Sequence, residues 1–236
     1  TDYPDHVLSG VARIFGDGVS PEDAVARILS DVRDNGDIAL QSWSERIDGT
    51  VPDPFQVAQN DLSSGRELIS AETSQAMKLA LDRIRTFHSL QPLSDWETKE
   101  LGGIMGQRMI PLERVGVYVP SGTASLPSSL LMAAIPAQVA GVQEIIVCTP
   151  PGKEGNQVAG VILAAAHMLG IDKVYQLGGA QAIAAMAYGT ETVPRVDKIV
   201  GPGNIFVTLA KQQVFGQVGI DGLFGPTETV IVADEA

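Results

Sequence analysis

The first third of the chain repeats apolar residues at the spacing of a helix. One buried stripe follows the i, i+3, i+4, i+7 pattern and consists of Val25, Ile28, Leu29 and Val32. Ser20-Pro21 supplies an N-cap and a first-turn proline for this helix, and Asn35-Gly36 predicts its end. The same spacing predicts two more helices, over residues 37–47 and 71–89. In the last of these, the inward positions are Met77, Leu81, Ile84 and Phe87.

From Val115 onward, short apolar runs alternate with helical segments. Strands are predicted over residues 115–119, 144–148, 173–177, 197–200 and 229–233. Helices are predicted over residues 128–140, 155–169, 179–188 and 204–215, and Pro136 is expected to kink or shorten the first. Strands that alternate with helices form βαβ units and a mostly parallel sheet, so we predict a Rossmann-like α/β domain. Before it, Gly102-Gly103 predicts a hairpin within residues 96–110.

Charge falls and glycine content rises near Arg114. Residues 1–114 hold 19 acidic residues, 11 basic residues and 9 glycines, whereas residues 115–236 hold 9, 5 and 16. A charge-rich segment with helical spacing is typical of solvent-facing helices, and a charge-poor one is typical of a parallel sheet covered on both faces. We therefore predict a mainly helical part over 1–114 and an α/β domain over 115–226.

The overall composition narrows the class of protein. With 16 basic and 28 acidic residues the net charge is −12, which argues against a nucleic-acid partner and an anionic membrane surface. The single cysteine, Cys148, excludes an internal disulfide and is expected to be a buried, inert thiol. No apolar run is long enough for a membrane span, and the first residues lack a signal-peptide profile. A soluble, intracellular protein is the expectation.

Three unusual turns follow predicted strands, at the edge where open α/β sheets bind ligands. They are Tyr118-Val-Pro-Ser-Gly122, Gly178-Gly-Ala-Gln181 and Gly201-Pro-Gly-Asn204. Glycine lets a ligand approach the backbone, and the helix that follows offers free N–H groups to an anion. Any one of these turns is explained by a tight connection, but the three together favour a nucleotide site. The polar side chains there are Tyr118, Gln181 and Asn204.

The other motifs of the sequence carry less information about function. The run Gly201-Pro-Gly-Asn-Ile-Phe206 begins like G-x-G-x-x-G but has phenylalanine at the sixth position, so it does not establish a dinucleotide site. The chain has no phosphate-binding P-loop and no nucleophile elbow. Its three histidines, His6, His88 and His167, lack metal-ligand spacing. From composition alone, Gly225-Pro-Thr-Glu228 is interpreted as a loop.

Several of these segments together resemble the histidinol dehydrogenase family. The resemblance starts near residue 20 and is dense from Arg114. It rests on Arg114-Val-Gly-Val-Tyr-Val-Pro-Ser-Gly122, Leu131-Met-Ala-Ala-Ile-Pro-Ala137, Gly178-Gly-Ala-Gln-Ala-Ile-Ala-Ala185, Val196-Asp-Lys-Ile-Val-Gly-Pro-Gly-Asn204 and Gly225-Pro-Thr-Glu228. Members of this family are zinc-dependent homodimers that use NAD to oxidise L-histidinol to the aldehyde and then to L-histidine. The resemblance implies such an activity in the cytoplasm.

The resemblance also assigns site residues. Tyr118, Gln181 and Asn204 match the family's NAD-contacting positions, and Thr227 matches a substrate-contacting position that is usually serine. Ser121 stands where the family usually has glycine. Both departures touch the site, so the resemblance also admits a related dehydrogenase that oxidises another small alcohol, such as a sulfonated diol.

Family members continue beyond the position that matches Ala236, and their zinc ligands and proton-handling Glu-His pair lie there. The resemblance therefore implies that this chain is an N-terminal portion, inactive by itself. It further implies that residues 1–114 form part of an incomplete domain, to which residues 227–236 return as a strand. Two alternatives remain open: a non-catalytic NAD-binding module, and an α/β protein that binds another nucleotide or a phosphorylated metabolite at the same strand ends.

Overall fold

A five-stranded parallel sheet is the centre of the computed structural model, which describes residues 3–91, 94–121, 125–152, 158–223 and 230–233. The strands lie in the order β5-β4-β3-β6-β7. Their bounds are Arg114–Tyr118 (β3), Glu144–Thr149 (β4), Lys173–Gln176 (β5), Lys198–Val200 (β6) and Gly219–Ile220 (β7). The parallel sheet and the mixed α/β class are as predicted, whereas β7 was not expected.

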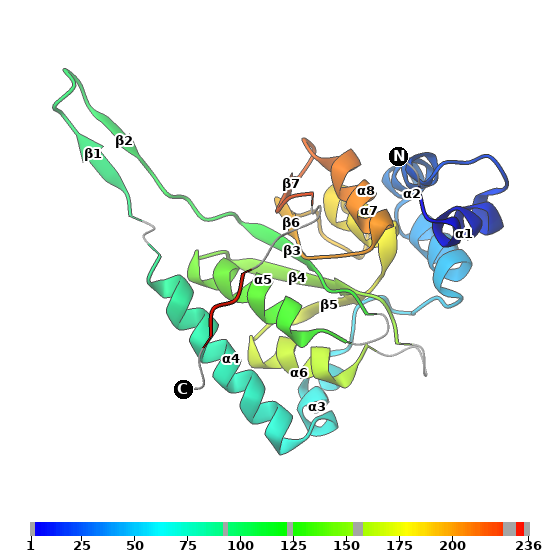
Figure 1. Ribbon diagram of the computed structural model, residues 1–236, viewed down its shortest axis with the longest axis horizontal. Helices are drawn as coiled ribbons and strands as arrows, with labels where there is room; N and C mark the ends of the chain where they lie inside the picture. The colour runs from blue at the N-terminus through cyan, green and yellow to red at the C-terminus, as the bar shows by residue number, and fades with distance from the viewer. Residues whose placement is uncertain (1–2, 92–93, 122–124, 153–157, 224–229, 234–236) are drawn as a thin grey trace.

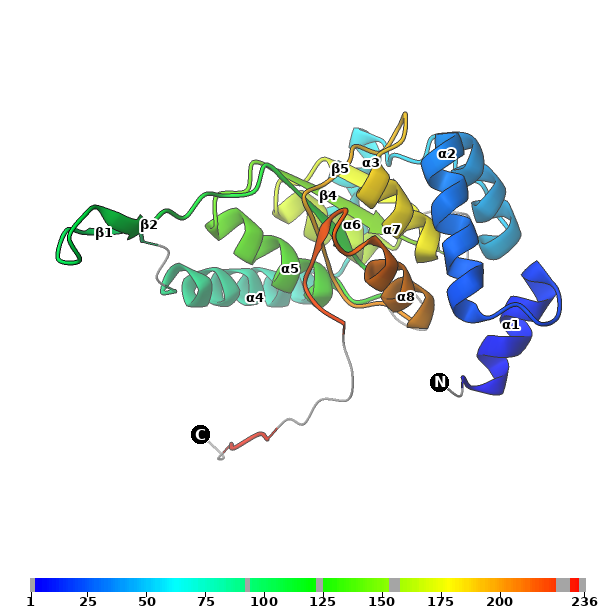
Figure 2. The same ribbon diagram turned by 90° about the horizontal axis from the view of Figure 1, so that it is seen from above.

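Helices cover both faces of this sheet (Figures 1 and 2). One core joins one face to α5 (Pro127–Val139) and α6 (Gly160–Met168). A second core joins the other face to α7 (Gly179–Tyr188) and α8 (Ile205–Val214). Alternate residues of β3 divide between the cores, with Val117 in the first and Tyr118 in the second, because side chains of a strand point to opposite faces. Because helices cover both faces of the sheet, the sequence of its strands is almost continuously apolar.

Helices from the N-terminal part extend both layers. α1 (Asp5–Phe15) and α2 (Pro21–Asp48) lie on the face of α7 and α8, and Figure 2 shows α2 beside α7. α3 (Gln59–Ser64) and the 3-10 turn η1 (Gly65–Leu68) contact α6, and α4 (Ala71–Ser89) contacts α5. α1 and α3 were not predicted. The third predicted helix is confirmed as α4, but Phe87 is 62% exposed rather than inward.

Residues 21–48 form two helical segments that meet at a sharp break at Gly36, as predicted. Gly36 interrupts the helical geometry with φ 54° and ψ −132°, which favours glycine. The freed backbone N–H of Asp37 donates to Glu191 Oε2 at 2.9 Å, and Asp37 accepts a hydrogen bond from Thr192. The loop after α7 therefore caps the second half of α2, a contact that joins residues 154 positions apart.

Two further segments complete the description. The predicted hairpin is confirmed as β1 (Trp96–Thr98) paired with β2 (Met105–Gln107), and it projects from the molecule in Figures 1 and 2. The strand predicted over 229–233 is wrong for residues 230–233, which form no strand and are strongly exposed. A strand needs a neighbour to bond its backbone, and no described strand pairs with this segment. None of the described helices combines the length and apolar character needed to cross a bilayer.

Candidate functional site

The strand order reverses between β3 and β6, and the carboxyl ends of these two parallel strands lie side by side there. The helix after β3 covers one face and the helix after β6 covers the other, so this is the switch point where open sheets bind ligands. Gly201 follows β6 with φ 117°, and a Cβ at this position would overlap with the carbonyl oxygen of Tyr118. Only glycine allows the two turns to approach this closely.

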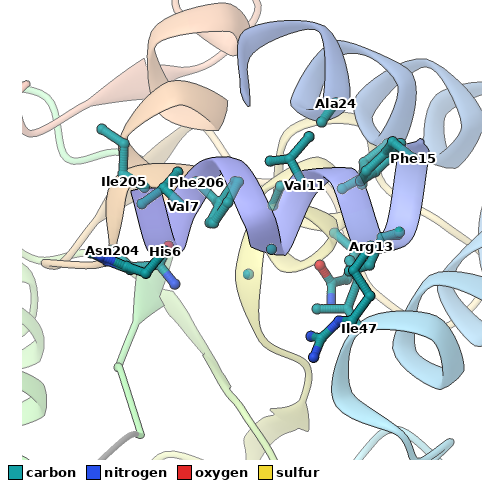
Figure 3. Close-up of a pocket in the computed structure, with 16 residues that line it drawn as sticks. His6, Val7, Val11, Arg13, Phe15, Ala24, Ile47, Asn204, Ile205 and Phe206 are labelled. Carbon is teal, nitrogen blue, oxygen red and sulfur yellow. The ribbon is translucent and has the colours of Figure 1, made fainter. Parts of the chain in front are cut away.

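A cavity of about 340 Å³ lies beside this point, between α1 and the first turns of α7 and α8. Gln181 and Asn204 both line it, so the structure brings together two of the predicted site residues. α1 supplies the opposite wall, with His6 at the Asn204 end and Arg13 at the Ile47 end (Figure 3). Between them the wall is apolar, because Val7, Val11 and Ile14 face the cavity.

Asn204 is the N-cap of α8. Its Oδ1 accepts a hydrogen bond from the backbone N–H of Val207 at 3.1 Å, which fixes the side chain at the mouth of the helix. The residue is exposed to solvent, unlike Gln181. The free N–H groups and the positive dipole end of α8 therefore face the cavity next to an accessible amide.

Gln181 lies in the first turn of α7 and is wholly buried. Its Nε2 donates to Oδ2 of Asp48 at 3.1 Å, whereas its buried Oε1 has no hydrogen-bond partner among the described residues. Desolvation raises the pKa of Asp48 from 3.8 to about 6, and the bond from Gln181 opposes part of that rise. An unpaired buried oxygen that lines a cavity is a place for a ligand's N–H or O–H donor.

Tyr118 lies behind the cavity rather than in its lining. Its ring is 3% exposed, and its hydroxyl accepts a hydrogen bond from the backbone N–H of Gly179 at 3.1 Å. Burial raises the pKa of Tyr118 to about 12, so the hydroxyl keeps its proton at neutral pH. Tyr118 therefore supports the turn that carries Gln181.

A buried ion pair holds the turn before Asn204. The Nζ of Lys211, which is 2% exposed, donates to the carbonyl oxygen of Gly201 at 2.9 Å and to Asp221. The other oxygen of Asp221 accepts the N–H of Gly201 at 2.8 Å. Both backbone polar groups of Gly201 are thus fixed by one pair of side chains.

Sequence reasoning missed the residues that support this site. Asp48 is 133 positions from Gln181, and no local pattern links the two. Lys211 could have been found from the sequence, because it is a lone cation in an otherwise uncharged helix. Thr227 lies outside the described residues. Among the described residues, no group of three or more His, Cys, Asp or Glu side chains is arranged to hold a metal ion.

Comparison with known proteins identifies the family. The histidinol dehydrogenase family model matches residues 16–236. A histidinol dehydrogenase from Deinococcus radiodurans is 51% identical over 233 residues, which cover 99% of this chain and 53% of that protein. One from Geobacillus kaustophilus is 51% identical over 90% of this chain and 50% of its own length.

A solved structure supports the same family assignment. The crystal structure of histidinol dehydrogenase from Elizabethkingia anophelis matches with a TM-score of 0.83 and 34% identity, over 96% of this chain and 53% of that one. The chain spans about half the length of the relatives it matches. With a parallel α/β fold, a family model that covers nearly all its residues and these relatives, the chain belongs to the histidinol dehydrogenase family.

Proposed function

We propose that the protein containing this chain is an NAD-dependent dehydrogenase that oxidises L-histidinol to L-histidine, and that this chain carries the NAD site. The observation that supports the NAD site is the cavity where the unpaired Oε1 of Gln181 meets the capped start of α8. NAD supplies a hydride acceptor when it is bound. The chain's own task is to bind it, orient it and exclude water.

Each element of the cavity suits part of that task. Gln181 Oε1 accepts from an N–H or O–H of the ligand, and the start of α8 with the Asn204 amide faces a negatively charged group. The apolar wall of α1 excludes water from the opposite side. Tyr118 fixes the Gly179 turn from behind, so the amide of Gln181 is held before the ligand arrives.

Zinc is proposed for the whole protein only. The resemblance places its ligands after Ala236, and the described residues offer no metal site. We propose accordingly that the 236-residue chain does not turn over by itself, and that the whole protein is a cytoplasmic homodimer acting on a small molecule. A nucleic-acid or membrane partner is not proposed, because the net charge is −12.

A second candidate substrate class follows from two departures in the sequence. Ser121 and Thr227 stand where the family usually has glycine and serine, and the resemblance assigns the second position to substrate contact. A pocket changed by one methyl discriminates by about 1–3 kcal/mol, which is enough to favour another small alcohol. NADH formation by the whole protein with L-histidinol and with a sulfonated diol separates the two candidates.

The NAD site is tested by calorimetric titration of NAD into the whole protein. Asn204→Ala is expected to raise the Kd about five- to tenfold, since a polar contact and the helix cap are lost. Asn204→Ser keeps a capping oxygen and separates the cap from the amide contact. Gln212→Ala, an exposed amide on the same helix, is the matched control and should leave the Kd unchanged. Equal affinity in the wild type and Asn204→Ala would argue against this site, and stronger ATP than NAD binding would favour the other-nucleotide alternative.

A further inference from the structure

Asp48 and Gln181 form a side-chain hydrogen bond between α2 and α7. Asp48 is the last residue of α2 and Gln181 lies in the first turn of α7, and the two helices pack against each other. The bond from Nε2 to Oδ2 measures 3.1 Å. Apolar residues at these positions would pack the helices without placing a carboxylate beside a buried amide.

This contact decides which end of the amide faces the cavity. If the amide were reversed, Oε1 would lie against the carboxylate of Asp48, and two acceptors repel. Because Gln181 is wholly buried, bulk water cannot stabilise the reversed orientation. Oε1 lies close to the backbone of Gly179, where a Cβ would come within 2.7 Å of it.

We propose that Asp48 is a positioning residue of the NAD site: its carboxylate holds the Gln181 amide so that Oε1 is presented as a fixed acceptor to a donor group of the cofactor. This inference rests on the proposed function. The group of the cofactor that contacts Oε1 is then an N–H or O–H donor, such as an amino, carboxamide or ribose hydroxyl group. A phosphate oxygen is excluded as that group.

A double-mutant cycle tests whether Asp48 acts through Gln181. In the whole protein, Asp48→Ala is expected to raise the Kd for NAD about fivefold, and Asp48→Asn about twofold, since asparagine can hold the amide in either orientation. In a Gln181→Met background, Asp48→Ala should change the Kd by less than about 1.5-fold, because no amide is left to orient. The control Glu45→Ala, an exposed acid in the same last turn, should have no effect.

The same fold-change in both backgrounds, or no change in either, would overturn the proposal. A role in helix packing alone would lower the melting temperature equally with and without Gln181, and it would not produce this coupling.

A second readout does not need the cofactor. The side-chain amide signals of Gln181, in whole protein labelled with ¹⁵N-glutamine and assigned by Gln181→Met, should shift as pH falls through about 6, where Asp48 becomes protonated. Asp48→Asn should abolish that shift. Tyr118 behind the amide and His6 and Arg13 across the cavity also face this region, so the measurement is repeated in a His6→Gln background.

The two readouts separate the possible failures. A wild type that does not bind NAD would refute the proposed function, whereas amide signals that ignore Asp48 would refute the positioning role.

Discussion

The polar side chains of the site differ in how well local sequence patterns predict them. Gln181 and Asn204 follow strands in glycine-containing turns, and this local pattern was enough to select them. Asp48 ends a long helix and lies 133 positions from Gln181. Local patterns can select candidate residues at strand ends, but a partner from a distant element leaves no such pattern.

Asp48 also makes a prediction about pH and stability. Its pKa is higher in the folded protein, about 6, than its ordinary value of 3.8, so ionisation opposes folding. This unfavourable contribution is absent below pH 4 and develops fully as pH rises past 6. Asp48→Asn cannot ionise, so its stability relative to the wild type should improve between pH 4 and 7.5.

The expected improvement is about 1 kcal/mol, reduced from the full effect of the shift because part of the Asp48 side chain stays in contact with solvent. Urea unfolding of both proteins at several pH values measures it. A difference that stays constant over this range, or moves toward the wild type, would contradict the prediction.

Among the elements, α2 shows where local patterns are sufficient. The apolar stripe predicted its first half, and Asn35-Gly36 predicted the break before the second helical segment. The contact that supports this break was not predictable, because Glu191, which accepts the N–H of Asp37, lies in the loop after α7. α1 was not predicted, although Val7, Val11 and Ile14 have helical spacing.

The kink predicts opposite effects for two glycine substitutions. Gly36→Ala should destabilise the protein by about 2 kcal/mol or more, because φ is positive and the new methyl overlaps with Glu191. Gly10→Ala, in the interior of α1 with open space around its Cβ, should stabilise it by about 0.5–1 kcal/mol. Chemical denaturation compares them, and a neutral Gly36→Ala would show that the kink relaxes freely.

The pair Lys211–Asp221 joins α8 to the turn after β6. Lys211→Met should cost about 2–4 kcal/mol of stability and weaken NAD binding, because Asp221 and the carbonyl of Gly201 lose a buried donor. Lys78→Met, at an exposed position of α4, is the control and should change stability by less than about 0.5 kcal/mol. If both variants unfold at the same urea concentration, the pair does not hold this turn.

For the whole molecule, the alternation of apolar runs and helices predicted the parallel sheet, but not the order of its strands. It did not predict β7, which has only two residues. The strand predicted near the C-terminus was wrong because an apolar run becomes a strand only beside a partner. Periodicity describes what a segment buries, but the neighbour it pairs with is a property of the assembled molecule.

Exposed apolar side chains predict how this chain behaves in solution. On and after the hairpin, Leu101, Ile104 and Ile110 are 71%, 69% and 76% exposed, and Val230 is 88% exposed. Apolar surface of this kind promotes association. The 236-residue chain should therefore sediment as concentration-dependent oligomers, and Ile104→Glu with Ile110→Lys should shift it toward the monomer. A wild-type chain that remains monomeric at all concentrations would rule this out.

The contact between Asp37 and Glu191 also has a consequence for synthesis on the ribosome. Its two residues are 154 positions apart, and at translation rates of about 5–20 residues per second the second emerges roughly 8–30 s after the first. For most of that interval the apolar stripe of α2 has no α7 or α8 to cover it. We therefore expect a chaperone that shields α2 to raise the soluble yield, and slower translation before residue 191 to lower it.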